Sequence, residues 1–205
     1  MKTTAFLAAP VLAAAAFLPA LTEASRPVDA PAPAAEAPAR FAIDTAHSWI
    51  LFKVNHLGIG TAWGSFSSFE GAFTLDAEDL SGSSVELSLD AASVTTNNKK
   101  RDDHLRGPDF FNAKEFPQVS FRSTAVEGSA DAFRVTGVIS LLGKEQEVVA
   151  ELKKVGEGGD PWGNHRAGFE GRFTLDRTAF GMDYMKEGLG TEVEVILAFE
   201  GVREK

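Results

Sequence analysis

The chain has 205 residues, 44% of them hydrophobic, and contains no cysteine. This length allows one domain with a sizeable core, and the lack of cysteine excludes disulfides, thiolate metal sites and thiol nucleophiles. The 29 acidic and 20 basic residues give a net charge of -9, which argues against binding nucleic acid or adhering broadly to anionic lipid, because both need a basic surface.

Residues 1–24 have the three-part pattern of a secretory signal peptide. Lys2 supplies the positive start, an Ala-rich apolar run follows, and Thr22 to Ala24 is a small-x-small cleavage site. An uncleaved membrane anchor is the alternative, but the run is short for a hydrocarbon layer of ~30 Å and two prolines interrupt it. We therefore expect cleavage and a periplasmic or secreted protein. The charge would not change, because Lys2 and Glu23 are lost together.

Residues 25–40 form a predicted linker. Four prolines and six alanines in this stretch cannot build a core, and a segment of this composition is typically extended and solvated. All 19 glycines follow Arg40, and this shift in composition predicts that the folded domain spans 41–205.

From residue 41 onward, apolar and polar side chains alternate with a period of two. Val193, Val195, Leu197 and Phe199, for example, face away from Glu192, Glu194 and Glu200, which indicates antiparallel strands with one apolar face. Turn residues, including a predicted turn at Gly156 to Gly159, divide the domain into strands at 48–57, 62–75, 82–94, 118–127, 131–142, 145–155, 166–175 and 190–202. Eight strands predict an all-β sandwich or up-and-down barrel.

The segment 97–112 breaks this alternation and is densely charged. It predicts a long crossing with a short helical turn, capped by Asn97 or Asn98, and such segments in compact β domains are typically functional or cover an opening. Because guanidinium groups suit anions, the candidate residues for a ligand headgroup or mouth are Asn97, Arg101, Asp102 and His104. The alternative is that these side chains fix the segment to the rest of the domain.

The four histidines, His47, His56, His104 and His165, lack the close spacing of common metal motifs. The sequence also has no nucleophile elbow and no phosphate loop. A metal-assisted hydrolase, built from histidines and aspartates that the fold brings together at the barrel mouth, remains the enzymatic alternative.

Residues 41–205 resemble the YceI-like family of lipid- or polyisoprenoid-binding proteins. The resemblance is carried by the order and spacing of several motifs, which run along the domain as DTAHS (44–48), FKVNHLG (52–58), GSFSSFEG (64–71), TN (96–97), RDDHL (101–105), DFF (109–111), FPQVSFRS (116–123), VTGVISLLG (135–143) and RTAFGM (177–182). The family implies an extended, lipocalin-like, eight-stranded antiparallel β-barrel.

The resemblance further implies a protein without catalytic activity or a cofactor, which carries or sequesters a long isoprenoid lipid such as a quinone or polyprenyl phosphate. Sixteen Phe against one Tyr would suit an apolar channel. On alternating strand positions and in the crossing, the candidate lining residues are Phe52, Val54, Val85, Leu87, Leu89, Phe110, Phe111, Phe121, Phe173, Val195, Leu197 and Phe199.

One further hypothesis stays open at this point. An envelope stress or structural partner would have a barrel filled by side chains instead of a ligand. The lipid carrier would make transient membrane contact and no contact with nucleic acid, and the sequence is compatible with a monomer or a homodimer.

Overall fold

The computed structural model describes residues 37–129 and 131–205, so the predicted signal peptide and residues 25–36 of the linker lie outside the described residues. Strands dominate this part of the chain. They are β1 (Ala39–Ile43), β2 (Trp49–His56), β3 (Gly60–Phe66), β4 (Phe69–Leu75), β5 (Ser84–Asp90), β6 (Val94–Thr95), β7 (Gln118–Gly128), β8 (Ala132–Leu141), β9 (Lys144–Gly159), β10 (His165–Asp176) and β11 (Leu189–Arg203). The helical elements are α1 (Lys99–Leu105) and the 3-10 turns η1 (Leu80–Gly82), η2 (Ala91–Ser93) and η3 (Arg177–Phe180).

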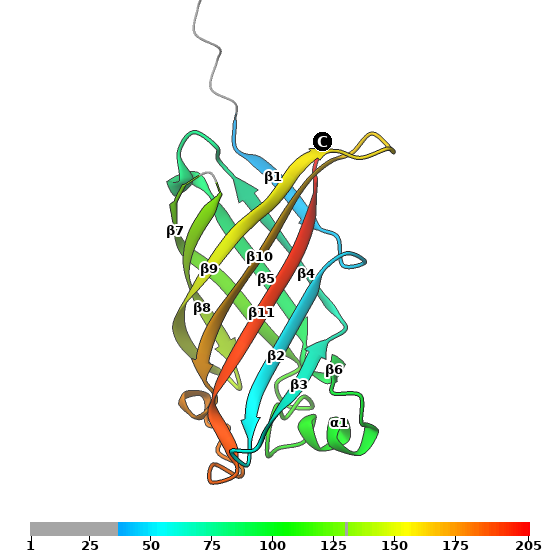
Figure 1. Cartoon of the computed structure of the whole chain (residues 1–205), viewed down its shortest axis with the longest axis vertical. Helices are drawn as coiled ribbons and strands as arrows, with labels where there is room; N and C mark the ends of the chain where they lie inside the picture. The colour runs from blue at the N-terminus through cyan, green and yellow to red at the C-terminus, as the bar shows by residue number, and fades with distance from the viewer. Residues whose placement is uncertain (1–36, 130) are drawn as a thin grey trace, which may run out of the picture. The chain divides into compact units, whose positions relative to one another are not determined.

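The strands close into an antiparallel barrel with eight positions (Figure 1). Five positions are occupied by β7 to β11, and three are each shared by two strands that follow one another in the chain, β1 with β2, β3 with β4, and β5 with β6. The ring closes because β11 pairs with β1 near its carboxyl end and with β2 over the rest of its length. The predicted eight-stranded barrel is confirmed.

Two details at the strand ends differ from the sequence prediction. Ala39 and Arg40, assigned to the linker, are the first residues of β1. The predicted turn at Gly156 to Gly159 is wrong, because these residues are part of β9 and pair with β10. The turn lies further on, where the Asp160 carboxylate accepts the backbone N–H groups of Trp162 and Asn164 at 2.9 and 2.8 Å.

Five phenylalanines pack across the barrel near β1. Phe41 stacks on Phe73 with ring centroids 4.8 Å apart, and Phe169 contacts Phe73, Phe133 and Phe199 at 5.3 to 5.5 Å. All five side chains are buried. Part of the phenylalanine excess therefore forms an ordinary packed core at this end of the barrel.

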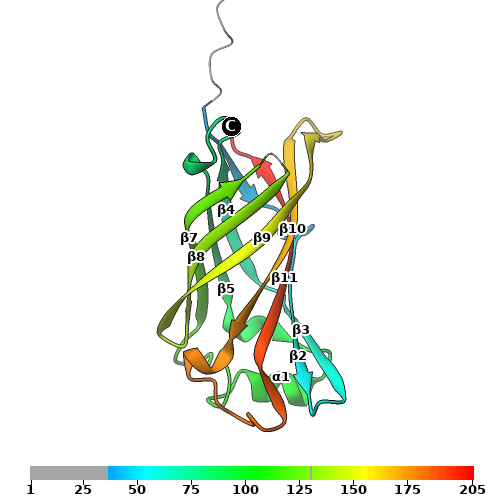
Figure 2. The same ribbon diagram turned by 60° about the vertical axis from the view of Figure 1, so that its left-hand side comes forward.

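The other end of the barrel is covered by segments that are not strands. Figures 1 and 2 show α1, the β2–β3 turn and the segment between β10 and β11 at this end, opposite β1 and the carboxyl terminus. α1 begins after Asn98, whose side chain accepts the backbone N–H of Arg101 at 3.1 Å, so the predicted cap at one of the two asparagines is confirmed. Within the described residues, no helix is long and apolar enough to cross a membrane.

Candidate functional site

An apolar cavity lies inside the barrel, between the phenylalanine cluster and the end covered by α1. Its volume, taken as the space open to the centre of a water molecule, is about 160 Å³. Strand residues form most of its wall, and Leu105, Phe110, Phe111 and Met182 contribute from the covering segments. Ser120 and Arg177 are the only polar or charged residues among those that line it.

All twelve side chains predicted to line a channel lie on this cavity, namely Phe52, Val54, Val85, Leu87, Leu89, Phe110, Phe111, Phe121, Phe173, Val195, Leu197 and Phe199. Alternation could find the ten that lie on strands because inward positions recur every second residue, whereas Phe110 and Phe111 lie in the segment between α1 and β7. Other lining residues on the same inward faces, such as Ile50, Phe66 and Ile139, follow the same rule but were not predicted. Whether these residues bind a ligand remains a prediction.

Arg177 is a buried cation at the cavity wall that the sequence analysis did not single out. Its side chain is 2% exposed, and its guanidinium donates to the carbonyl oxygens of Met182, Tyr184, Leu189 and Gly190 at 2.6 to 3.0 Å. Burial lowers the pKa of Arg177, and the charges of Asp176 and Asp183 oppose that shift. Through its four hydrogen bonds, the guanidinium holds the β10–β11 segment, which covers the cavity, in place.

Of the predicted headgroup residues, none lines the cavity. Arg101 turns back on its own loop, donating from Nε to Thr96 Oγ1 and from Nη2 to the Thr96 carbonyl, both at 2.7 Å. Asn97 has a left-handed backbone, with φ of 63°, and lies exposed beside the helix cap. Such contacts are expected if these side chains fix the loop in place instead of binding a headgroup.

Asp102 is buried and accepts hydrogen bonds from Thr95 Oγ1 at 3.2 Å and from the backbone N–H and hydroxyl of Thr96. Burial by itself would raise the pKa of Asp102, but the hydrogen bonds from Thr96 and Thr95 outweigh it and the pKa is lowered. The carboxylate therefore stays charged and joins α1 to the segment before it.

His104 packs against a residue that lines the cavity. Its Nε2 lies 2.8 Å from Asp109 Oδ2, and its ring packs edge-on against Phe110 and Tyr184, with centroids 5.1 and 5.0 Å away. Because Phe110 lines the cavity, His104 supports the wall from outside.

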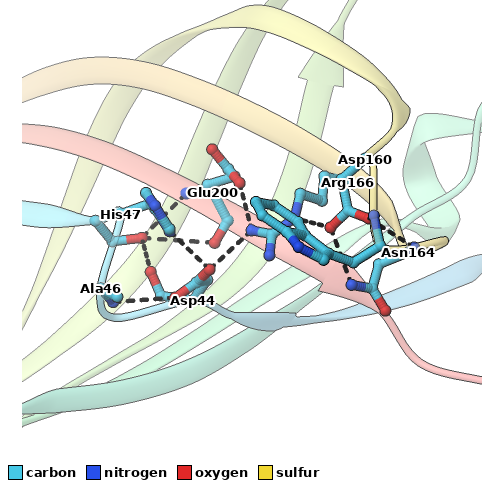
Figure 3. Close-up of polar contacts among 9 residues, drawn as sticks. Asp44, Ala46, His47, Asp160, Asn164, Arg166 and Glu200 are labelled. Carbon is cyan, nitrogen blue, oxygen red and sulfur yellow. Dashed lines mark hydrogen bonds and ion pairs between the residues drawn. The ribbon is translucent and has the colours of Figure 1, made fainter.

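A metal-assisted hydrolase would require histidine and carboxylate side chains close enough together to bind one metal ion. Among residues 37–129 and 131–205, one group of three candidate metal ligands lies close together, formed by Asp44, His47 and Glu200. Figure 3 shows that Arg166 reaches into this group from β10. Its Nη1 donates to Asp44 Oδ2 at 2.7 Å and to Glu200, and its Nε donates to Asp160 Oδ2 at 2.7 Å. A guanidinium already pairs with these carboxylates and occupies their oxygen atoms, so the donor set suits an ion-pair network rather than a metal ion.

This ion-pair network shifts the pKa values of its members. Hydrogen bonds from Arg166 and then His47 lower the pKa of Asp44 to about 2, and the Arg166 guanidinium likewise holds the pKa of Asp160 below its ordinary value. None of the residues of this network lines the cavity. The histidines do not converge, since His104 pairs with Asp109, and His165 with Glu157.

A closed antiparallel barrel around an apolar cavity defines the class of small β-barrels that have interior space for a slender ligand. The match to a family model is more specific: it covers residues 41–201 and describes a YceI-like domain. The chain belongs to the YceI-like family.

Relatives agree with this assignment, and solved structures share the fold. A UPF0312 protein of Pectobacterium carotovorum is 39% identical over 166 residues, covering 81% of this chain and 86% of the relative. A UPF0312 protein of Pseudomonas aeruginosa is 39% identical over 158 residues, covering 77% and 83%. BcnA of Burkholderia cenocepacia has the same fold with a TM-score of 0.70 at 23% identity, covering 77% of this chain and 98% of BcnA. A polyisoprenoid binding domain from Saccharophagus degradans aligns with a TM-score of 0.62 at 14% identity, covering 82% and 100%.

Proposed function

We propose that this protein binds a lipid with a long isoprenoid chain, such as a quinone or polyprenyl phosphate, and carries or sequesters it without catalysing a reaction. The observation that carries the proposal is the apolar cavity inside a closed barrel. The YceI-like family and the structural likeness to a polyisoprenoid binding domain support it. Burying each methylene in such a cavity contributes about 0.8 kcal/mol.

The cavity is large enough to hold part of an isoprenoid chain. Its 160 Å³ counts only the positions open to the centre of a water molecule, so the space that ligand atoms can fill is larger. A single water molecule needs only about 10–15 Å³, and the cavity therefore has room for a run of several chain carbons as the barrel stands.

The wall indicates that the ligand is recognised by its chain. Apart from Ser120, the one polar group is the Arg177 guanidinium, and four carbonyl oxygens already accept its hydrogen bonds. A polar headgroup buried among the other side chains would lack partners, which is costly. The headgroup is therefore expected to remain at the covered end of the barrel, in contact with water.

The test is to purify the protein from its native host, record native mass spectra and identify lipids by solvent extraction. The expected result is stoichiometric isoprenoid lipid in the protein. The proposal fails if the purified protein carries no lipid and takes up none when a prenol is offered. A different co-purified molecule, such as a fatty acid, would refute the isoprenoid assignment while keeping the cavity as a lipid site.

We further propose that the protein is exported, on the basis of the signal-like residues 1–24. Intact mass spectrometry of the mature protein tests this directly. The proposal predicts a chain that begins near Ser25 in the periplasmic or secreted fraction, whereas a full-length chain in the membrane fraction would support the anchor.

A further inference from the structure

Four large hydrophobic side chains are exposed at the end of the barrel that α1 covers. Ile59 is 85% exposed and Leu57 52%, both in the β2–β3 turn, and Met185 and Tyr184 of the β10–β11 segment are 44% and 43% exposed. These four residues will be called the apolar tips. Exposed hydrophobic residues gathered at one place indicate an interaction site.

The apolar tips belong to one continuous structure. The Leu57 N–H donates to the Gly188 carbonyl at 2.7 Å, which ties the β2–β3 turn to the β10–β11 segment. A Cβ added at Gly188 would come within 2.9 Å of both Met185 Cε and Leu57 Cδ2, so these two side chains converge over that glycine.

The apolar tips also lead to the cavity. Tyr184 packs on Phe110 with ring centroids 5.3 Å apart, and Phe110 lines the cavity. The Leu189 N–H donates to the Met185 carbonyl at 2.8 Å, and Leu189 lines the cavity as well. Tyr184 therefore contacts a residue of the cavity wall directly, and Met185 is linked to another by a backbone hydrogen bond.

The β2–β3 turn can leave water at little cost. Residues 57–63 contain no charged side chain. The N–H groups of Leu57, Gly58 and Ile59 donate within the protein, to the Gly188 carbonyl, Asn55 Oδ1 and the His56 carbonyl at 2.7 to 3.2 Å. A polar group that keeps its hydrogen bond avoids most of the penalty for entering an apolar medium.

The hairpin at the opposite end of the barrel contrasts with the uncharged β2–β3 turn, although the β10–β11 segment also carries charges at positions 183, 186 and 187. Val155 and Trp162 are 64% and 80% exposed there, but charged residues surround them, including Glu157, Asp160 and Arg166, and neither lines the cavity. Taking this charged hairpin out of water would be costly.

We propose that the apolar tips dock this end of the barrel on a lipid bilayer by hydrophobic insertion, so that the cavity faces the membrane from which it takes or to which it returns its lipid. This inference rests on the proposed function. A bilayer is the favoured partner because a water-insoluble ligand resides there and because the tips lie beside the cavity. With a net charge of -9 and an uncharged turn, docking should depend on apolar burial more than on anionic headgroups.

The test is flotation of the full mature protein with vesicles of phosphatidylcholine. Ile59→Asp should lower the partition coefficient about tenfold or more, because it replaces inserted apolar surface by a charge. Val155→Asp and Trp162→Asp are matched controls at the other end and should bind like wild type. Raising NaCl from about 0.1 M to about 1 M, which screens exposed charges, should leave binding in place. Wild-type protein that stays unbound, an equal loss in the Trp162 variant, or binding that requires anionic lipid would overturn the proposal.

A second measurement separates this inference from the proposed function. Each variant is offered geranylgeraniol either from ethanol or from phosphatidylcholine vesicles, and loading is followed by native mass spectrometry. Ile59→Asp should load normally from ethanol and poorly from vesicles. If no form of the protein loads from either source, the proposed function fails; if Ile59→Asp loads from vesicles as fast as wild type, only the docking surface fails.

Discussion

Asp102 and Arg177 are the two buried charged residues among those that the structure describes. Asp102, in α1, accepts hydrogen bonds from Thr95 and Thr96. Arg177 donates hydrogen bonds to carbonyl groups of the β10–β11 segment. Both covering segments are thus held by a single ion with several hydrogen bonds. At the scale of single residues, these two buried charges position the segments that cover the cavity.

Replacing Asp102 tests this role. Asp102→Ala would leave the Thr96 N–H and two hydroxyl groups without their acceptor, and we expect the free energy of unfolding to fall by about 2–3 kcal/mol. Urea denaturation measures the change. Asp103→Ala is the control, because Asp103 is half exposed and its loss should cost no more than about 0.5 kcal/mol. Equal stability of the two variants would contradict the assignment.

The Arg166 network predicts how stability depends on pH. The pKa of Asp44 is lowered from 3.8 to about 2 in the folded protein, so the folded state favours the charged carboxylate. This contribution is fully present above about pH 4 and is lost as the pH falls through about 2. The melting temperature, recorded from pH 6 down to pH 2, should decline in this window.

Arg166→Met identifies the cause of that decline. It should lower the melting temperature at pH 6, where three carboxylates lose their cation, and the difference from wild type should shrink toward pH 2. Arg134→Met removes an exposed pair with Glu151 and should have little effect at any pH. A constant difference for Arg166→Met across the range would count against the network.

How far the sequence predicts these residues depends on the kind of contact. The inward positions of the cavity wall follow from strand alternation, so Leu87 and Val195 could be assigned without coordinates. The partners of Arg101 and Arg177 are backbone carbonyls of irregular segments, and no periodic pattern specifies where such carbonyls point. The sequence therefore points to Arg101 without indicating its partner, and no pattern marks Arg177 as a residue of the cavity wall.

At the scale of elements, the strands carry the cavity and the irregular segments cover it. Strand positions could be predicted because apolar alternation and turn residues agree along most of the chain. Where they disagreed, the prediction failed: the glycines at 156–159 resemble a turn, yet their N–H and C=O groups belong to the β9–β10 ladder. The breaks between β1 and β2 and between β3 and β4 divide single positions of the barrel into two strands. No turn residues in the sequence mark these breaks as clearly as they mark the other strand ends.

β11 offers a matched pair of substitutions for the cavity. Val195 lines it, whereas Ile196 is not among the lining residues. Val195→Trp should fill the space, so that lipid extracted per mole of protein falls severalfold while the barrel still folds, with overpacking costing about 1–3 kcal/mol. Ile196→Trp should keep its lipid. Lipid content and thermal unfolding are measured on the same samples, and full loading of Val195→Trp would contradict a ligand in this cavity.

At the scale of the whole molecule, a ligand that binds only the closed barrel stabilises the fold. At a free ligand concentration about a hundred times its dissociation constant, the gain is about 2.7 kcal/mol. Delipidated protein should therefore melt at a lower temperature than the protein as isolated, and added prenol should restore the difference. Val195→Trp is the control, since its melting temperature should not respond to the prenol. An unchanged melting temperature on delipidation of the wild type would argue against binding in the interior.

The phenylalanine cluster near β1 has a consequence for the order of events in transfer. Because five rings pack across the barrel there, a chain that enters from the end covered by α1 would have to leave by the same path. A prenyl lipid would go in tail first and come out head first. Its headgroup would contact the acceptor while the tail is still bound in the barrel. Loading and delivery would then use the same face of the protein, so donor and acceptor could not bind there at the same time.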